Sequence, residues 1–363
     1  MKKFLFKLLF LTQSVIALFF FKTKIHQAWE GFHYDTFNVF HWKKIRFTDA
    51  EPNRNFIKTK HILANPKKFN AFVFGSSRVQ YLPPDKLPNK IGETELRWYN
   101  MTSSAVLAIE NYMTLKTFID NNVSVDMIIL GFDDISLYAT LDARKKDLMR
   151  VPYQEIMENK LKYLSAYLFM RTEESIIDII NSYDEETHKQ DSKLFYDWGG
   201  SLLNYDLTET ADLKRYETLI QTSSQEKITY AVDSIKAIKD LCAKNNIKLI
   251  LFTNPLYQTT YRSAVNAGYF EYLHSIAQNC EFYNFSSVNK YTTDPRYYFD
   301  WSHYRPAVGL QIEKMIFGTE EERAQACLEA DDELWGIKVN AENIDFVIKK
   351  LQEQLKEPSQ ARK

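Results

Sequence analysis

Short apolar runs alternate with longer amphipathic segments over most of the chain. Five runs are continuously apolar and bounded by polar residues, as expected of strands that are buried on both faces. The segments between them repeat apolar residues near a 3.6-residue period, which predicts helices. The predicted strands are Asn70–Gly75, Leu96–Met101, Val125–Phe132, Ile247–Pro255 and Cys280–Phe285, and the predicted helices are Ser103–Asn121, Glu226–Asn245 and Arg262–Gln278.

The alternation of strands and helices predicts an α/β domain with a parallel sheet covered on both faces. A ligand of such a sheet binds beyond the carboxyl ends of its strands. Residues 135–225 interrupt the alternation with helical and aromatic segments. We expect them to form a helical insertion over the sheet edge, within a domain that spans residues 69–356.

The N-terminal stretch from Phe4 to Phe21 is apolar and has lysines on both flanks. It is just long enough to cross a bilayer, and no small-residue cleavage signature follows it. We expect residues 1–24 to be an uncleaved membrane anchor, residues 25–68 a juxtamembrane stalk and residues 357–363 a charged tail. The domain would then lie outside the cytoplasm, in a periplasm or at the cell surface. A buried helix of a soluble protein is the alternative interpretation.

Composition argues against several classes of protein. The formal charge is −1, with acidic and basic residues interspersed, so nothing favours binding to nucleic acid. Cys242, Cys280 and Cys327 lie far apart in the sequence, which indicates buried thiols rather than a disulfide framework. The sequence contains no P-loop, GxGxxG or HExxH, and its histidines lack ligand spacing. We therefore expect neither a cofactor nor a metal.

Two hydroxyl side chains follow the first predicted strand in "FNAFVFGSSRV", at Ser76 and Ser77. A valine ends this window, so the motif is not GxSxG. Near the C-terminus, "FDWSHYRP" places Asp300 three residues before His303, within reach on one helical turn. An imidazole oriented by a carboxylate can take the proton of a serine hydroxyl. A strand-end serine, His303 and Asp300 are therefore candidates for nucleophilic catalysis.

Four short motifs resemble, in chain order, the sequence blocks of the SGNH/GDSL hydrolases. They are "GSS" after the first predicted strand, "YN" with small residues after the second, "GFDD" after the third and "DWSH" near the end. The resemblance extends over about residues 51–350. Its GSSR form is similar to membrane-anchored proteins that act beside membrane-bound O-acyltransferases on cell-surface polymers. The resemblance implies a flavodoxin-like three-layer αβα sandwich with a central parallel sheet of about five strands.

The resemblance also implies a role for each matching residue. Ser77 takes the place of the nucleophile, His303 that of the general base and then acid, and Asp300 that of its orienting partner. Ser76 takes the place of the aspartate in the GDS form, and we interpret it as a turn residue. Arg78 is expected to anchor the loop through a salt bridge.

The match is incomplete at the oxyanion hole. The family uses the serine N–H, a glycine N–H of the second block and an asparagine side chain of the third. Here the glycine position falls on Ala105 or Ser104, and Asp133 replaces the asparagine. An ionised Asp133 donates no hydrogen bond and would repel an oxyanion. Either Asn100 or Asn254 substitutes at a strand end, or the hole is poor, or the chain no longer catalyses.

The expected function is that of an extracytoplasmic, membrane-anchored serine esterase or O-acyltransferase. Its substrates would be acyl esters of a cell-surface polysaccharide, and its partner a membrane-bound O-acyltransferase. The alternative is an inactive SGNH-like scaffold that binds a polysaccharide or such an acyltransferase. A soluble lipase-like esterase is a further alternative, which the apolar N-terminal stretch disfavours. If Ser77 and His303 lie well apart in the structure, the catalytic interpretation is wrong.

Overall fold

The computed structural model describes residues 12–14, 53–82, 86–134, 140–141, 150–168, 197–200, 203, 205–207 and 223–356. The chain divides into a smaller unit, Met1–His61 with Arg144–Asp197, and a larger unit, Ile62–Ala143 with Trp198–Lys363. Apart from residues 12–14, the predicted anchor lies outside the described residues, as does the predicted tail. No helix in the described ranges is long and apolar enough to cross a membrane.

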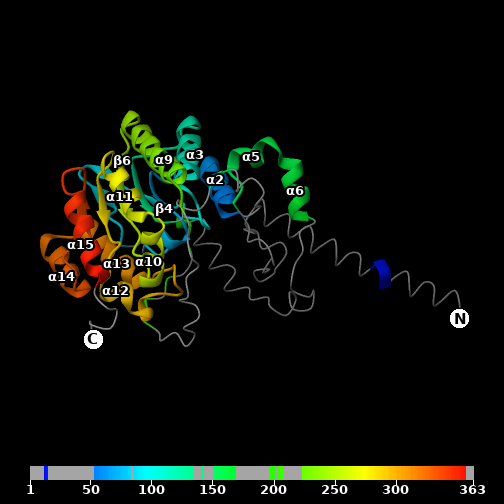
Figure 1. The fold of residues 1–363 in the computed structure, drawn as a ribbon. Helices are drawn as coiled ribbons and strands as arrows, with labels where there is room; N and C mark the ends of the chain where they lie inside the picture. Colours follow the sequence, from blue (N-terminus) through cyan, green and yellow to red (C-terminus); the bar gives the residue numbers. More distant parts are fainter. Residues whose placement is uncertain are drawn as a thin grey trace. The chain divides into compact units, whose positions relative to one another are not determined.

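The larger unit is built on a mostly parallel sheet of six strands in the order β4-β1-β5-β6-β7-β8. Figure 1 labels two of these strands, β4 and β6. The mixed α/β class and the five predicted strands are confirmed. The sixth strand, β8, was not predicted; it pairs antiparallel with β7 at the sheet edge. The strands are β1 (Ala71–Phe74), β4 (Trp98–Asn100), β5 (Met127–Phe132), β6 (Lys248–Thr253), β7 (Phe282–Asn284) and β8 (Ile337–Val339).

Both faces of this sheet are buried, which explains why its strands are apolar throughout. In β1, Phe72 and Phe74 belong to one hydrophobic cluster, whereas Ala71 and Val73 belong to another. The first cluster also takes residues from α3 (Ala108–Asp120), α9 (Gln225–Lys244), α10 (Gln258–Asn266), α11 (Tyr269–Ala277) and α15 (Ile344–Lys356). The second takes residues from α13 (Pro306–Phe317) and α14 (Glu320–Ala330). Helices therefore pack on both faces of the sheet.

Short elements complete the larger unit and make the loops compact. These are η1 (Ser77–Val79), the hairpin of β2 (Lys90–Ile91) and β3 (Thr94–Glu95), α12 (Lys290–Thr293) and η4 (Pro295–Tyr297).

Cys242 and Cys280 are buried and Cys327 is partly buried, all three as free thiols, in agreement with the prediction.

One predicted helix is wrong in its extent. The sequence pattern predicts a single helix over Arg262–Gln278, but the structure has α10 and α11 in its place. Gly268, between them, has a φ of 94°, in the left-handed region that glycine adopts without steric cost. The glycine therefore ends α10 and turns the chain before α11 begins.

The smaller unit contains α5 (Tyr153–Glu158), α6 (Lys160–Leu168) and the first part of α2 (Arg54–Ala64). Phe56 and Ile57 of α2 share a small hydrophobic cluster with Val151, Ile156 and Tyr163. The C-terminal part of the predicted stalk is thus a packed helix rather than a linker. The helical prediction for the insertion is confirmed at α5 and α6, and most of its remaining residues lie outside the described ranges.

Candidate active site

A glycine sets the turn that carries the candidate nucleophile. Gly75 follows β1 with a φ of 142°, and a Cβ atom there would lie 2.7 Å from the carbonyl oxygen of Gly131. A larger residue is therefore excluded by both backbone conformation and space. The chain then enters η1, where the Ser76 side chain accepts a hydrogen bond from the Arg78 N–H at 3.3 Å. This turn leaves Ser77 partly exposed at the carboxyl end of β1.

Ser77, His303 and Asp300 form a continuous hydrogen-bonded series. Ser77 Oγ lies 2.8 Å from His303 Nε2, although the two residues are 226 positions apart in the sequence. His303 Nδ1 lies 2.9 Å from Asp300 Oδ2 and 3.0 Å from Oδ1. The distances are those of a serine, a base and an orienting acid. The three residues that the sequence nominated are thus brought together.

The surroundings of Asp300 favour its ionised form. Burial raises the pKa of this carboxyl, but hydrogen bonds from the His303 ring and from two backbone N–H groups outweigh burial, so the pKa lies below its ordinary value of 3.8. The N–H groups of Ser302 and His303 donate to Oδ1 at 2.7 and 2.9 Å. An ionised Asp300 can only accept a hydrogen bond, so His303 carries its proton on Nδ1. His303 Nε2 is then the nitrogen that can take a proton from Ser77.

Arg78 connects the nucleophile turn to the histidine loop. Its guanidinium is buried and forms a salt bridge with Asp134, which confirms the expected anchoring role. Its Nε also donates a hydrogen bond to Ser302 Oγ at 2.5 Å. Because Ser302 precedes His303 directly, this contact fixes the base relative to Ser77. The sequence offers no spacing signal for Ser302, and it was not among the predicted site residues.

Asp133, placed where the resemblance puts an amide donor, is held within the protein. It is 2% exposed, and Oδ2 accepts hydrogen bonds from Ser76 Oγ at 2.7 Å and from Asn254 Nδ2 at 3.3 Å. Arg78 Nη1 lies 3.7 Å from Oδ1. Asp133 thus supports the nucleophile turn through Ser76, and the neighbouring guanidinium offsets its charge.

The two asparagines considered as substitute donors also have partners in the protein. Asn254 Nδ2 points to Asp133, as described above. Asn100 Nδ2 donates to the carbonyl oxygen of Gln80 at 3.3 Å, and its Oδ1 accepts from Thr102 N at 2.9 Å. Each amide nitrogen therefore has one acceptor in the protein, and an amide NH2 group can donate two hydrogen bonds.

The loop that follows β4 lies beside the nucleophile turn. Ser76 and Ser103 form an isolated parallel bridge, so Ser104 and Ala105 come immediately after a point of backbone pairing. Ala105 has a φ of 51°, in the left-handed region where glycine is favoured. This conformation agrees with the position at which the family resemblance expects a glycine. The structure therefore brings the candidate backbone donors close to the turn of Ser77.

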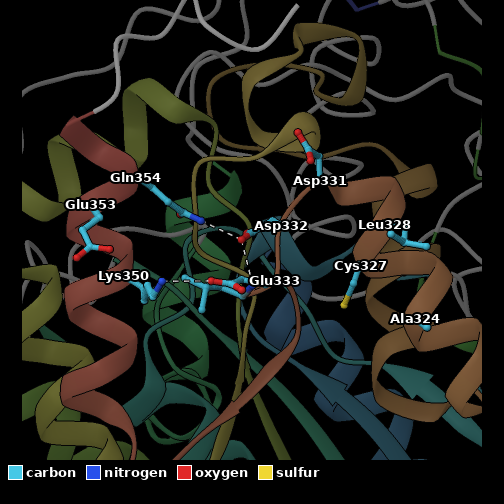
Figure 2. Close-up of a pocket in the computed structure, with 10 residues that line it drawn as sticks. Ala324, Cys327, Leu328, Asp331, Asp332, Glu333, Lys350, Glu353 and Gln354 are labelled. Atoms are coloured by element: carbon cyan, nitrogen blue, oxygen red, sulfur yellow. Dashed lines mark hydrogen bonds and ion pairs between the residues drawn. The ribbon is translucent and has the colours of Figure 1, made fainter.

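A separate hollow of about 690 Å³ lies between α14 and α15 and contains none of the three triad residues. Figure 2 shows Asp332 and Gln354 pointing toward each other, at 2.9 Å, and Lys350 facing Glu333, at 3.6 Å. Asp332 also accepts from Ser287 Oγ at 2.5 Å. These contacts join α15 and the loop after β7 to the segment that follows α14. Within the described ranges, no group of three or more His, Cys, Asp or Glu side chains is arranged to hold a metal ion.

Comparison with known proteins adds no assignment, because no family model matches the chain and no curated protein matches it significantly.

Proposed function

We propose that this protein is a serine esterase or O-acyltransferase of the SGNH/GDSL type, which works through an acyl-enzyme on Ser77. The observation that carries the proposal is the hydrogen-bonded series from Ser77 through His303 to Asp300. With these groups, acyl transfer takes two steps, in which the acyl group first moves to the serine and then leaves it. The domain would be a flavodoxin-like three-layer αβα sandwich, with the site beyond the carboxyl ends of its strands.

In the first step, His303 Nε2 removes the Ser77 hydroxyl proton as Oγ attacks the carbonyl carbon of an ester. The carbon–oxygen bond to the leaving alcohol then breaks, and His303 returns the proton to that alcohol. Ser77 keeps the acyl group as an ester. In the second step, water or a sugar hydroxyl attacks this ester, again with His303 as base, which releases a carboxylic acid or an acylated sugar.

The oxyanion of each tetrahedral intermediate would be held by backbone N–H groups of the Ser77 turn and of the Ser104–Ala105 segment. No asparagine side chain completes the hole in this scheme, because Asp133 stands at that position. Loss of one donor from an oxyanion hole costs about a hundredfold to a thousandfold in turnover. We therefore expect a slow enzyme, which suits a polymer-modifying role better than a role in rapid metabolism.

The proposal extends to the setting of the reaction. The apolar N-terminal segment supports a membrane anchor with the domain outside the cytoplasm. An acylated cell-surface polysaccharide would be the substrate, and a membrane-bound O-acyltransferase the partner that delivers or receives acyl groups. Both assignments rest on the resemblance of the GSSR motif.

Labelling with a serine-reactive fluorophosphonate tests the proposal. We expect wild-type protein to be labelled, Ser77→Ala to be unlabelled, and the matched variant Ser76→Ala to keep its label while losing stability. Peptide mapping by mass spectrometry should locate the adduct on Ser77. Persistent labelling of Ser77→Ala would show that the nucleophile is assigned wrongly.

The inactive-scaffold alternative has one observation in its favour, which is the carboxylate of Asp133 in place of an amide donor. It predicts that folded wild-type protein reacts no faster than His303→Ala. Adding His303→Ala to the labelling experiment therefore decides between the two functions.

A further inference from the structure

A second cavity opens in the larger unit, at the end of the sheet away from Ser77. Its volume is about 540 Å³, and it is lined by Lys248–Leu251, the first residues of β6. Ser77, His303 and Asp300, by contrast, lie beyond the carboxyl end of β1. The cavity is thus distinct from the proposed active site and shares no residue with it.

The cavity lies where β6 has no paired strand on its β7 side. β6 pairs with β5 along six residues, from Lys248 to Thr253. Its pairing with β7 consists of Phe252 opposite Tyr283 alone. The first residues of β6 therefore have no register partner in β7, and they line the cavity together with Glu281 and Phe282.

Part of the cavity wall is apolar. Ile250, Tyr283 and Phe317 line it and are only partly buried, although each packs against a hydrophobic cluster of the core. Ile316 and Phe282, both buried, lie behind them. Partly exposed aliphatic and aromatic side chains around a cavity of a few hundred cubic ångströms are typical of small-molecule sites. An apolar chain placed here would complete the burial of this wall.

The charged residues of the cavity are mostly cationic. Lys90, Lys248, Arg323 and Lys338 come from four different elements, and Glu281 is the single carboxylate among the lining residues. Glu281 is already paired with Lys338 at 3.1 Å. Within the described ranges, Lys248 and Arg323 form no ion pair with a carboxylate, and Arg323 Nη2 donates only to the carbonyl oxygen of Ile316 at 3.5 Å. The chain as a whole has a formal charge of −1, so this positive charge is a local feature.

We propose that this cavity binds a short amphiphilic anion, with an apolar chain against Ile250 and Phe317 and a carboxylate or phosphate head between Lys248 and Arg323. Charge complementarity selects the anionic head, and the apolar wall selects the chain. The site is independent of acyl transfer at Ser77. Binding measurements therefore test this site separately from the proposed function.

Isothermal titration calorimetry with the full chain in a neutral detergent tests the site. The probes are hexyl phosphate and hexanoate, with hexyltrimethylammonium and inorganic phosphate as controls. We expect saturable binding of the first two and no binding of the cation. Inorganic phosphate should bind at least tenfold more weakly than hexyl phosphate, because it cannot use the apolar wall.

Charge reversal locates the site. Lys248→Glu and Arg323→Glu should each weaken the binding of hexyl phosphate by about tenfold, since each replaces an attraction by a repulsion. Lys349→Glu, an exposed substitution of the same kind on α15, should leave the affinity unchanged. None of these residues belongs to the triad, so Ser77 labelling should stay at the wild-type rate. Equal affinity in all three variants, absence of saturable binding, or equal binding of inorganic phosphate would each overturn the proposal.

Discussion

Arg78 Nε donates a hydrogen bond to Ser302 Oγ at 2.5 Å, and this contact joins the residue after Ser77 to the residue before His303. The same guanidinium forms a salt bridge with Asp134, at the end of the β5 segment. Three loops of the proposed active site therefore meet at one buried side chain. Arg78 touches no reacting atom in this scheme and acts as a positioning residue.

Replacing Arg78 by lysine should separate positioning from folding. A lysine ammonium can still pair with Asp134, but it lacks the planar fork that reaches Ser302 at the same time. We expect kcat for p-nitrophenyl acetate to fall by about tenfold or more, with KM nearly unchanged, since a small misplacement of a catalytic group costs rate rather than binding. Ser302→Ala should reproduce the loss while the melting temperature stays close to that of wild type. Wild-type kcat in both variants would assign Arg78 a purely structural role.

Asp133→Asn restores the residue type that the family resemblance expects at this position. The structure predicts no gain in activity, because residue 133 is turned toward Ser76 and Arg78. The amide would weaken its contacts to both groups, and we expect a loss of about 1–3 kcal/mol in the free energy of unfolding. Urea denaturation and esterase rates on the same samples measure both effects. A rate increase of tenfold or more would instead place residue 133 in the oxyanion hole.

The stability of the protein should depend on pH through Asp300. Its pKa in the folded protein lies below the ordinary value of 3.8, so folding favours the ionised form. The resulting stabilisation is complete above pH values near the ordinary pKa and is lost as the pH falls through the folded pKa. The difference in unfolding free energy between wild type and Asp300→Asn should therefore shrink below about pH 4. Asp233→Asn, at an exposed position on α9, is the control and should show no such trend. A difference that grows at low pH would contradict the assignment.

Gly75→Ala should damage the site through the backbone. The added methyl group would clash with Val79 Cγ2 and lie 2.7 Å from Gly131 O, at a φ of 142°. Overpacking and an unfavourable φ together cost about 2–5 kcal/mol. We expect a lower melting temperature and loss of Ser77 labelling in the fraction that remains folded. Gly92→Ala offers a comparison at a φ of 59°, since a Cβ there meets nothing within 4 Å.

The parallel core of the fold was predictable because strands buried on both faces are apolar without interruption. β8 escaped prediction because Ile337–Val339 is a short edge strand with a lysine in its middle, which resembles a loop in the sequence. The approach of Ser77, His303 and Asp300 to one another was predicted from "GSS" and "DWSH", the two motifs that carry the resemblance. The partners of Asp133 and the contact of Arg78 with Ser302 were not predictable, since they depend on how loops far apart in sequence pack together. Gly268 is a signal for a helix break, but apolar residues repeat at helical spacing on both sides of it. The pattern therefore predicted one continuous helix over Arg262–Gln278.

The separation of Ser77 from His303 by 226 positions has a consequence for how the protein matures. Contacts between such distant segments form only after the intervening chain has been ordered, because loop closure must precede them. During synthesis the turn of Ser77 emerges long before His303, so on the proposed function Ser77 would stay unactivated while the chain is incomplete. On that function, reactivity toward a fluorophosphonate would report the completion of folding, and a chain truncated before His303 would not react however well its first strands assemble.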